Sequence, residues 1–399
     1  MTEPAASDAL AWHPLARLPD EWRAWLKTEG EAPFRADQVF RWIHRQGELS
    51  PSNMSNLALP LRERLAAQGL RAPGSVVDVK RAQDGTRKLL VEFEKGARVE
   101  CVIIPMTPKT AEDTAYLVDP EGDPEDDEPP SQAPESHTKV TLCISTQYGC
   151  AMGCVFCASG QFGLQRGLGA HEIVFQVLLA RRYLEPGELL SNLVFMGMGE
   201  PLHHYDETAR AVRLITHPEG IGMSTRRLTV STVGLPSGIQ KLGDDFAGKV
   251  GLAVSLHAPD DETRSRIIPM NQRYPVAKLL AALKAYPLPR RRRITIEYTL
   301  IAGVNDSVEH AERLADLLRG LKVKVNLIPM NPIEASSLAA PSDAVVSRFR
   351  ETLTERGYSC FVRTRRGDDV LAACGQLALQ GEAATQGAVR LRRGKTDGV

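Results

Sequence analysis

The 399-residue sequence lacks the segments that mark membrane and secreted proteins. No run of about 18 apolar residues occurs in it, which excludes a conventional transmembrane helix. Its start, MTEPAASDALAWHPLARLPDEW, lacks the basic residues and apolar core of a signal peptide. We therefore expect a cytoplasmic protein with no membrane partner. Thiols stay reduced in that compartment, so the seven cysteines indicate metal or redox chemistry more than structural disulfides.

The sequence also lacks net charge, because 49 Lys and Arg residues balance 49 Asp and Glu residues. The balance is uneven along the chain, since residues 111–136 hold ten acidic residues and no Lys or Arg. Basic clusters stand elsewhere, in PRRRRITI (289–296), RTRRG (363–367) and VRLRRGK (389–395). Such clusters suit a polyanion such as RNA, or they are ordinary solvated surface.

The composition and periodicity of the chain change along its length. Apolar residues at helical spacing in RADQVFRWIHRQG (35–47) predict a helix that ends at Gly47. Alternation in KLLVEFEKGARVECVIIPM predicts a β-hairpin that turns at Lys95-Gly96. The next stretch is rich in proline and acidic residues, which predicts a disordered loop. The predicted segments are 1–75 (helical), 76–106 (β-hairpin extension), 107–137 (acidic insert), 138–357 (barrel) and 358–399 (C-terminal extension).

From residue 139 onward, short apolar runs alternate with longer amphipathic stretches. This alternation predicts a parallel sheet, either in a partial or complete barrel or in a doubly wound open sheet. A last strand, SCFVRTR (359–365), and a short helix near VLAACGQLAL (370–379) are expected after it. The six runs are KVTLCIS (139–145), NLVFM (192–196), RLTVST (227–232), GLAVSLH (251–257), RITIEYTLI (293–301) and VKVNLIP (323–329).

Glycine-rich and polar motifs follow these runs at their carboxyl ends. GCAMGCVFC (149–157) follows the first run and GMGEP (197–201) follows the second. Ser231 and Thr232 end the third run, Ser255 and His257 end the fourth, and PMNP (329–332) follows the sixth. Because the carboxyl ends of parallel strands share one face, we expect these motifs to converge on one site.

Cys150, Cys154 and Cys157 have the spacing C-x3-C-x2-C. Thiolates are soft ligands that suit zinc or an iron–sulfur cluster. A structural zinc site needs four ligands, and Cys143 is a candidate for the fourth. The sequence has no second C-x2-C, and Phe156 before the last cysteine fits a cluster loop. These residues alone leave open a zinc-stabilised RNA-binding protein without catalysis.

C-x3-C-x-aromatic-C after a first strand resembles the signature of the radical S-adenosylmethionine (SAM) superfamily. GMGEP, VSLHAP, NLIPMNP and TRRGDDVLAACGQL, in this order, resemble motifs of the 23S rRNA (adenine-C2)-methyltransferases that also act on tRNA. The similarity spans about residue 90 to residue 380 and is interrupted by the acidic insert. It implies an α/β fold with a partial (βα)6 TIM-like radical SAM barrel, an RNA-binding N-terminal helical domain and a small β-hairpin extension.

The resemblance also implies roles for individual residues. Cys150, Cys154 and Cys157 would hold one [4Fe-4S] cluster whose open iron binds SAM. Cys374 would be methylated on sulfur, Cys143 would resolve the adduct by forming a disulfide, and Glu100 would accept a proton. The residues that match SAM-contacting positions are Gly199, Glu200, Ser231, Ser255, Leu256, His257 and Asn331.

The implied product is 2-methyladenosine in 23S rRNA and tRNA. Carbon 2 of adenine is not nucleophilic, so a covalent route through Cys374 splits an otherwise inaccessible methyl transfer into feasible steps. The expected ping-pong reaction uses two SAM molecules per turnover and takes electrons from a flavodoxin-type donor. We expect the enzyme to be a monomer. The alternative within the resemblance is carbon-8 methylation of the same rRNA adenine. The insert at 107–137 departs from the family, and we expect it to loop away because its charge repels RNA.

Overall fold

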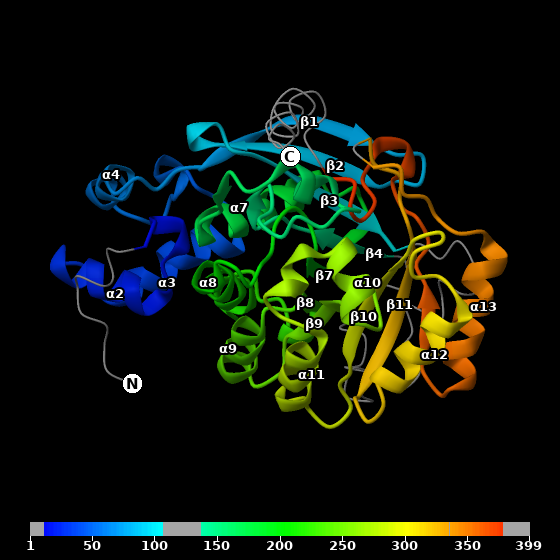
Figure 1. The fold of residues 1–399 in the computed structure, drawn as a ribbon. Helices are drawn as coiled ribbons and strands as arrows, with labels where there is room; N and C mark the ends of the chain where they lie inside the picture. Colours follow the sequence, from blue (N-terminus) through cyan, green and yellow to red (C-terminus); the bar gives the residue numbers. More distant parts are fainter. Residues whose placement is uncertain (1–11, 107–136, 335, 378–399) are drawn as a thin grey trace, which may run out of the picture.

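The computed structural model describes residues 12–106, 137–334 and 336–377, and Figure 1 shows their arrangement. All of the acidic insert predicted at 107–137 except His137 lies outside these residues, as does the basic VRLRRGK segment. Within the described residues, no helix is long and apolar enough to cross a membrane.

The N-terminal part is helical, as the sequence predicts. Pro19 and Glu21 begin the first long helix: proline suits the first helical position, and the Glu21 carboxylate accepts the Leu18 N–H at 2.7 Å. The predicted helix around Phe40 continues as one turn of π-helix and stops before Gly47, whose φ is +72°. The helices are α2 (Pro19–Thr28), α3 (Phe34–Phe40) with the π-helical turn Arg41–Arg45, and α4 (Leu59–Ala67).

An antiparallel meander joins the helical part to the main sheet. It consists of β1 (Gly74–Arg81), β2 (Arg87–Phe93) and β3 (Arg98–Pro105). The turn between β2 and β3 lies at Lys95 and Gly96, whose φ angles of 64° and 72° are left-handed, so the predicted hairpin turn is confirmed. β3 then pairs antiparallel with the first barrel strand, which makes the meander continuous with the main sheet.

The six apolar runs predicted as strands from residue 139 onward form part of one parallel array. Within the described residues, the sheet has the order β1-β2-β3-β4-β7-β8-β9-β10-β11-β12, in which β12 is an edge strand. The array is therefore a partial rather than a complete barrel. Its parallel strands are β4 (Thr138–Cys143), β7 (Glu188–Phe195), β8 (Leu228–Thr232), β9 (Gly251–Ser255), β10 (Ile294–Leu300), β11 (Val323–Pro329) and β12 (Cys360–Val362).

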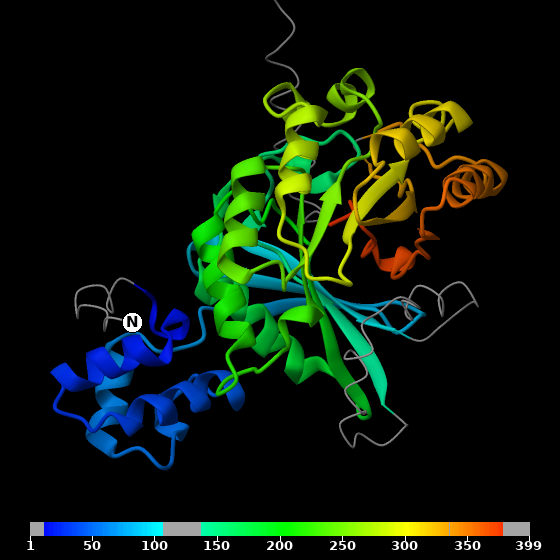
Figure 2. The same ribbon diagram turned by 90° about the horizontal axis from the view of Figure 1, so that it is seen from below.

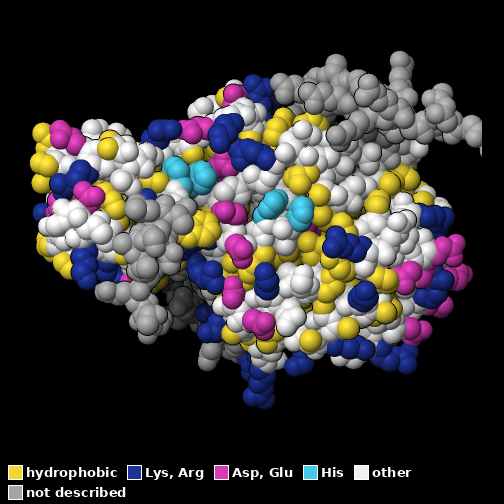
Figure 3. Space-filling view, turned by 60° about the vertical axis from the view of Figure 1, so that its left-hand side comes forward, with side chains coloured by type: hydrophobic (Ala, Val, Ile, Leu, Met, Phe, Trp, Pro, Cys, Tyr) yellow, Lys and Arg dark blue, Asp and Glu magenta, His cyan; other side chains and the backbone are white. Residues whose placement is uncertain are grey.

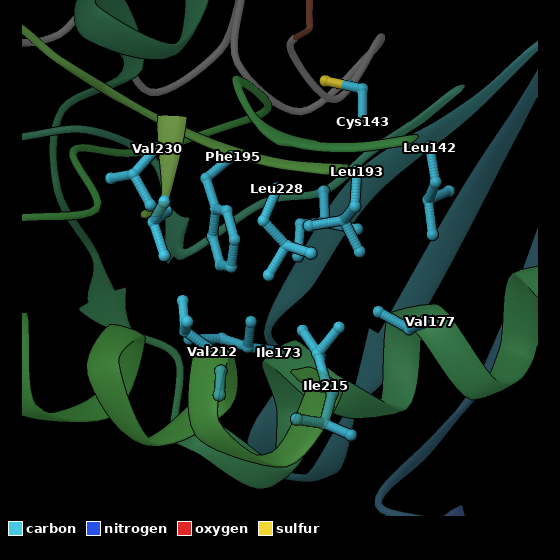
Figure 4. Packing of buried hydrophobic residues seen from close by; sticks show 14 of the residues in the cluster. Leu142, Cys143, Ile173, Val177, Leu193, Phe195, Val212, Ile215, Leu228 and Val230 are labelled. Atoms are coloured by element: carbon cyan, nitrogen blue, oxygen red, sulfur yellow. The ribbon is translucent and has the colours of Figure 1, made fainter. Parts of the chain in front are cut away.

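Helices cover one face of this sheet, and the C-terminal segment lies on the other side (Figure 2). Figure 4 shows Leu193, Phe195 and Val230 of the sheet pointing toward Ile173 and Val212 of the covering helices. This apolar layer is the core that the amphipathic stretches bury. The helices after β4 are α6 (Ala158–Phe162), α7 (Ala170–Ala180), α8 (Tyr205–Thr216), α9 (Pro236–Phe246), α10 (Asp261–Ile267), α11 (Val276–Ala285), α12 (Val308–Leu317) and α13 (Asp343–Glu355).

The face of the sheet away from the helices is polar. In Figure 4 the sulfur of Cys143 points away from the helix-facing core, opposite to its neighbour Leu142. Polar side chains from successive strands line a cavity of about 380 Å³ on the same side as Cys143, among them Thr141, Asn192 and Thr295. One face of the sheet is therefore buried in the apolar core, and the other face lines the cavity.

One predicted element is absent from the part of the chain that the structure describes. The sequence led us to expect a short helix near residues 370–379, but residues 371–377 form turns after the single 3-10 turn Asp368–Val370. Gly367, Leu371 and Gly375 all have positive φ, which breaks helical continuity. Residues 378 and 379 lie outside the described range.

Candidate active site

Two adjoining cavities lie at the carboxyl ends and on the polar face of the parallel strands. The smaller one, of about 160 Å³, is lined by the three motif cysteines; the larger one is lined by Cys143. This arrangement confirms that the motifs after the strands converge on one region. The residues that line both cavities are Met196, Glu297, Ile328, Asn331, Arg363 and Cys374.

A tight loop after β4 carries Cys150, Cys154 and Cys157. The loop bends sharply because Gly149 has φ +79°, and a Cβ on it would lie only 1.8 Å from the Gly163 carbonyl oxygen. The Cys157 N–H donates to the Cys154 carbonyl at 3.2 Å, which closes the last turn of the loop. Glycine at 149 is therefore a steric requirement of this loop.

The three thiols fit an iron–sulfur cluster better than a single zinc ion. In the described ranges, no three His, Cys, Asp or Glu side chains are grouped closely enough to hold one metal ion. Cys150, Cys154 and Cys157 nevertheless line one cavity, where each thiolate could bind a different iron of a cluster. Cys143, the candidate fourth zinc ligand, does not line this cavity. Burial raises the pKa of Cys150 to about 12, so iron binding would replace a thiol proton.

GMGEP follows β7 and forms one wall of the smaller cavity. Gly199 has φ +105°, and a Cβ there would meet the side chain of Gln147 at 2.6 Å. The Glu200 carboxylate accepts the N–H groups of Leu202 at 3.0 Å and Val233 at 2.7 Å. Burial raises the pKa of Glu200 to about 7, and these hydrogen bonds oppose the rise. Glu200 thus fixes the ends of β7 and β8 to each other.

Ser231, Ser255 and His257 line the same cavity, at the ends of β8 and β9. The Nδ1 atom of His257 accepts the Thr299 N–H at 2.8 Å, which leaves Nε2 to carry the proton. Burial lowers the pKa of His257 to about 3, so the ring is neutral at physiological pH. Leu256, predicted with them, is fully buried and is not among the described residues that line the cavity.

Arg264 of α10 is a site residue that motif analysis missed. Its side chain is 1% exposed and donates to the carbonyls of Leu256 at 3.0 Å, Val233 at 2.5 Å and Ser255 at 3.1 Å. It also donates to the Asn271 amide oxygen at 2.8 Å. The guanidinium therefore ties together the ends of β8 and β9. In the sequence, Arg264 is an ordinary arginine of the helical stretch DETRSRI and belongs to no motif, so the sequence does not indicate this role.

The loop that carries Cys374 docks between the cysteine loop and the end of β11. The Asn331 side-chain amide donates to the Cys374 carbonyl at 3.0 Å. The Ala158 N–H donates to the Gly375 carbonyl at 2.8 Å, and the Ser159 hydroxyl donates to a backbone carbonyl further along the loop. These bonds place a residue from the far end of the chain beside the cysteine loop.

Cys143 and Cys374 lie close enough for the charge of one to affect the pKa of the other. Burial raises the pKa of Cys143 to about 12; the charge on Cys374 adds to the rise, and Arg363 opposes it. Both cysteines line the larger cavity, and Cys374 alone of the two also lines the smaller one. The structure thus separates Cys143 from the three loop cysteines, as the sequence reading expects for a thiol outside the cluster.

Glu100 occupies a different position from the other predicted site residues. Its buried carboxylate pairs with Lys88 at 3.0 Å, and Lys88 also donates to the Leu371 carbonyl at 3.0 Å. Glu100 is not among the described residues that line either cavity. It reaches the Cys374 loop through Lys88, and its role as a proton acceptor stays a prediction.

The basic cluster at 290–293 contributes to the larger cavity. Arg291, Arg292 and Arg293 line it before the start of β10, together with Arg226 and Arg227 before β8. By contrast, basic and acidic side chains are interspersed on the face shown in Figure 3. The cavity therefore concentrates positive charge that this outer face does not.

Comparisons with known proteins agree with this geometry. The model for the ribosomal RNA large subunit methyltransferase N-terminal domain matches residues 19–69, and the radical SAM superfamily model matches residues 144–318. A dual-specificity RNA methyltransferase RlmN from Sorangium cellulosum is 59% identical over 375 residues, 92% of this chain and 96% of its own length. The chain belongs to the RlmN family of radical SAM RNA methyltransferases. An RlmN protein from Anaeromyxobacter dehalogenans is 43% identical over 374 residues, 92% of each chain.

The RlmN family membership also agrees with the fold. The crystal structure of a radical SAM methyltransferase from Sphaerobacter thermophilus matches with a TM-score of 0.80 at 40% identity, covering 91% of this chain and 98% of that one. The predicted α/β radical SAM fold with an N-terminal helical region is confirmed. Radical SAM proteins use an iron–sulfur cluster and SAM, so the non-catalytic zinc alternative is wrong.

Proposed function

We propose that this RNA methyltransferase forms 2-methyladenosine in 23S rRNA and in tRNA, by a ping-pong reaction through S-methylated Cys374. One observation supports the proposal above all: Cys374 lines both the cavity of the three loop cysteines and the cavity of Cys143. A methyl carrier needs such a position, because it must meet the methyl donor on one side and the RNA base on the other. We also propose that the enzyme is a monomer, that it acts in the cytoplasm, and that a flavodoxin-type protein supplies its electrons.

Cys374 acts as the nucleophile of the first half-reaction. Its sulfur bonds to the methyl carbon, and Asn331 holds its backbone carbonyl during the transfer. When bound, the cluster and SAM supply the methyl group and the one-electron chemistry that activates it. The predicted SAM contacts Gly199, Glu200 and Ser231 line the cavity of the three loop cysteines, which supports a role in binding SAM there.

Cys143 acts in the release step. Once the carbon carried by Cys374 is bonded to carbon 2 of the adenine, the Cys143 thiolate attacks the sulfur of Cys374 and the carbon–sulfur bond breaks. The electron pair leaves with the carbon, which takes up a proton to become the methyl group of the base. The product is a disulfide between Cys143 and Cys374, which an external reductant must open before the next turnover. Glu100 accepts the proton from carbon 2 in this proposal, and its carboxylate contacts Lys88, which in turn donates to the Leu371 carbonyl of the Cys374 loop.

RNA as the substrate class rests on charge and on the relatives. The arginines at 226, 227 and 291–293 line the cavity that contains Cys143, and clustered arginines attract a phosphate backbone. The family model that matches residues 19–69 is named for ribosomal RNA methyltransferases, and the curated relatives are named dual-specificity RNA methyltransferases. These observations support rRNA and tRNA as substrates, with the helical N-terminal part as a further binding surface.

Mass spectrometry of protein and RNA tests the proposal. The anaerobically purified enzyme is incubated with SAM and reductant, and the Cys374 peptide is expected to gain the mass of one methylene. Target RNA is expected to contain 2-methyladenosine after reaction with the wild type and with the matched Cys360→Ala control, because Cys360 lines neither cavity. Cys374→Ala is expected to be inactive. Methylation of RNA by Cys374→Ala would refute the mechanism, and 8-methyladenosine as product would establish the carbon-8 alternative.

A further inference from the structure

Glu297 of β10 and Asn326 of β11 form a buried polar pair that the proposed mechanism does not use. They are register partners in the parallel ladder, and their side chains are 4% and 2% exposed. The Asn326 amide nitrogen donates to Glu297 Oε1 at 3.1 Å. Since a carboxylate can only accept, this contact orients the amide nitrogen toward Glu297 and the amide oxygen elsewhere.

The pair leaves two oxygen acceptors without a hydrogen bond. Neither Glu297 Oε2 nor Asn326 Oδ1 has a partner among the described residues. Buried acceptors of this kind cost stability and are rare, so their presence indicates a ligand with hydrogen-bond donors. Two acceptors on adjacent strands fit a ligand that presents two donors close together.

The cavities that Glu297 and Asn326 line indicate whether this ligand is the RNA base or the cofactor. Both residues line the cavity that contains Cys143 and Cys374, where the RNA base must meet the methyl carrier. Glu297 also reaches the cavity of the loop cysteines, but Asn326 does not line it. The pair as a unit therefore faces the RNA side of Cys374 rather than the cofactor side.

We propose that Glu297 and Asn326 recognise the exocyclic amine of the target adenine, each accepting one of its two N–H groups. This inference rests on the proposed function, since it assumes that an adenine reaches Cys374. A 6-keto purine would place an acceptor against two acceptors and be rejected, so the pair would determine specificity for adenine. Burial raises the pKa of Glu297, whereas Arg363 and the Asn326 hydrogen bond favour the ionised, accepting form.

Glu297→Gln tests the inference with little change in shape. The new amide oxygen can accept from Asn326, and the new amide nitrogen then puts an N–H donor in the place of the acceptor Oε2. The wild-type holoenzyme and the variant are compared on three short RNA hairpins that carry adenosine, purine riboside or inosine at the target position. The control is Glu262→Gln, which makes the same chemical change at an exposed carboxylate of α10.

The expected readout is a ratio of kcat/KM values, which partial loss of active enzyme does not alter. The wild type and Glu262→Gln should prefer adenosine to purine riboside by about ten- to a hundredfold, the size of a lost hydrogen bond to a charged group. In Glu297→Gln the ratio of kcat/KM for adenosine to that for purine riboside should fall to near one. The inosine hairpin should then have a higher kcat/KM than the adenosine hairpin. Anisotropy of labelled RNA with the holoenzyme should show the same loss of preference in Kd.

Three outcomes would overturn the inference or its basis. An unchanged adenosine preference in Glu297→Gln would overturn it. A KM for SAM that rises in Glu297→Gln by the same factor with all three hairpins would also overturn it, because the pair would then contact the SAM ribose hydroxyls. Failure of the wild type to form 2-methyladenosine on the adenosine hairpin would instead overturn the proposed function, which keeps the two failures distinct.

Discussion

Arg264 should stabilise the site more than its position on a short helix suggests. Arg264→Met keeps most of the aliphatic volume but removes every donor of the guanidinium. The carbonyls of Val233 and Ser255 and the Asn271 amide oxygen then lose this donor, whereas the Leu256 carbonyl keeps the Ala258 N–H at 2.8 Å. Water has little access to replace it, because the side chain is 1% exposed.

The magnitude follows from the three acceptors that lose a donor. Each buried acceptor without a donor costs about 1 kcal/mol at the low end of the usual range, so the loss is about 3 kcal/mol. Removal of the buried charge offsets part of this, since burial lowers the pKa of Arg264 to about 10. For a chain of this length, a loss of about 3 kcal/mol lowers the thermal midpoint by roughly 4 °C.

Thermal unfolding followed by circular dichroism measures this effect on the purified protein. Arg266→Met is the matched control, because Arg266 lies two residues away on the same helix and is exposed. Its midpoint should stay within about 1 °C of the wild type, as expected for a surface substitution. Equal midpoints for the Arg264 and Arg266 variants would refute the argument that the guanidinium holds the ends of β8 and β9.

Two further predictions concern the Cys374 loop and pH. Asn331→Ala removes the hydrogen bond to the Cys374 carbonyl and should slow methylation of Cys374 about tenfold, which timed mass spectrometry measures; a wild-type rate would contradict the positioning role. Burial lowers the pKa of His44 to about 3, so protonation favours the unfolded chain, where the pKa is about 6.5. Its contribution to stability is therefore complete above pH 6.5 and is lost as pH falls toward 3, by about 2 kcal/mol at pH 5. His44→Leu should flatten the fall of thermal midpoint between pH 7.5 and 5, and an unchanged slope would count against this assignment.

The elements of the barrel were predictable because their signals are local. The runs RLTVST and VKVNLIP are apolar and β-branched, and both become strands within one residue of the expected bounds, whereas the strand expected at NLVFM begins four residues earlier. The turn at Lys95-Gly96 was predictable because glycine tolerates positive φ. The helix expected near Cys374 was wrong because VLAAC has good helix formers, but the loop instead satisfies its backbone through Ala158 and Asn331.

Part of the site was also accessible from sequence. Cys150, Cys154 and Cys157 stand in one short motif, so their spacing alone indicates a cluster loop. Residues whose role depends on partners far along the chain gave no signal. Arg264 and the Glu297–Asn326 pair belong to ordinary helix and strand patterns, and only burial and unsatisfied hydrogen bonds distinguish them.

The sequence by itself determined the alternation of strands and helices, the cysteine loop and the order of motifs at the strand ends, because each depends on near neighbours and on backbone propensity. The tertiary structure decided that Cys374 meets both Cys143 and the cysteine loop. It also decided that the polar face of the sheet lines a basic cavity with two unsatisfied acceptors. Those relations join residues up to about 230 positions apart, and only the folded chain, through packing and buried hydrogen bonds, fixes them.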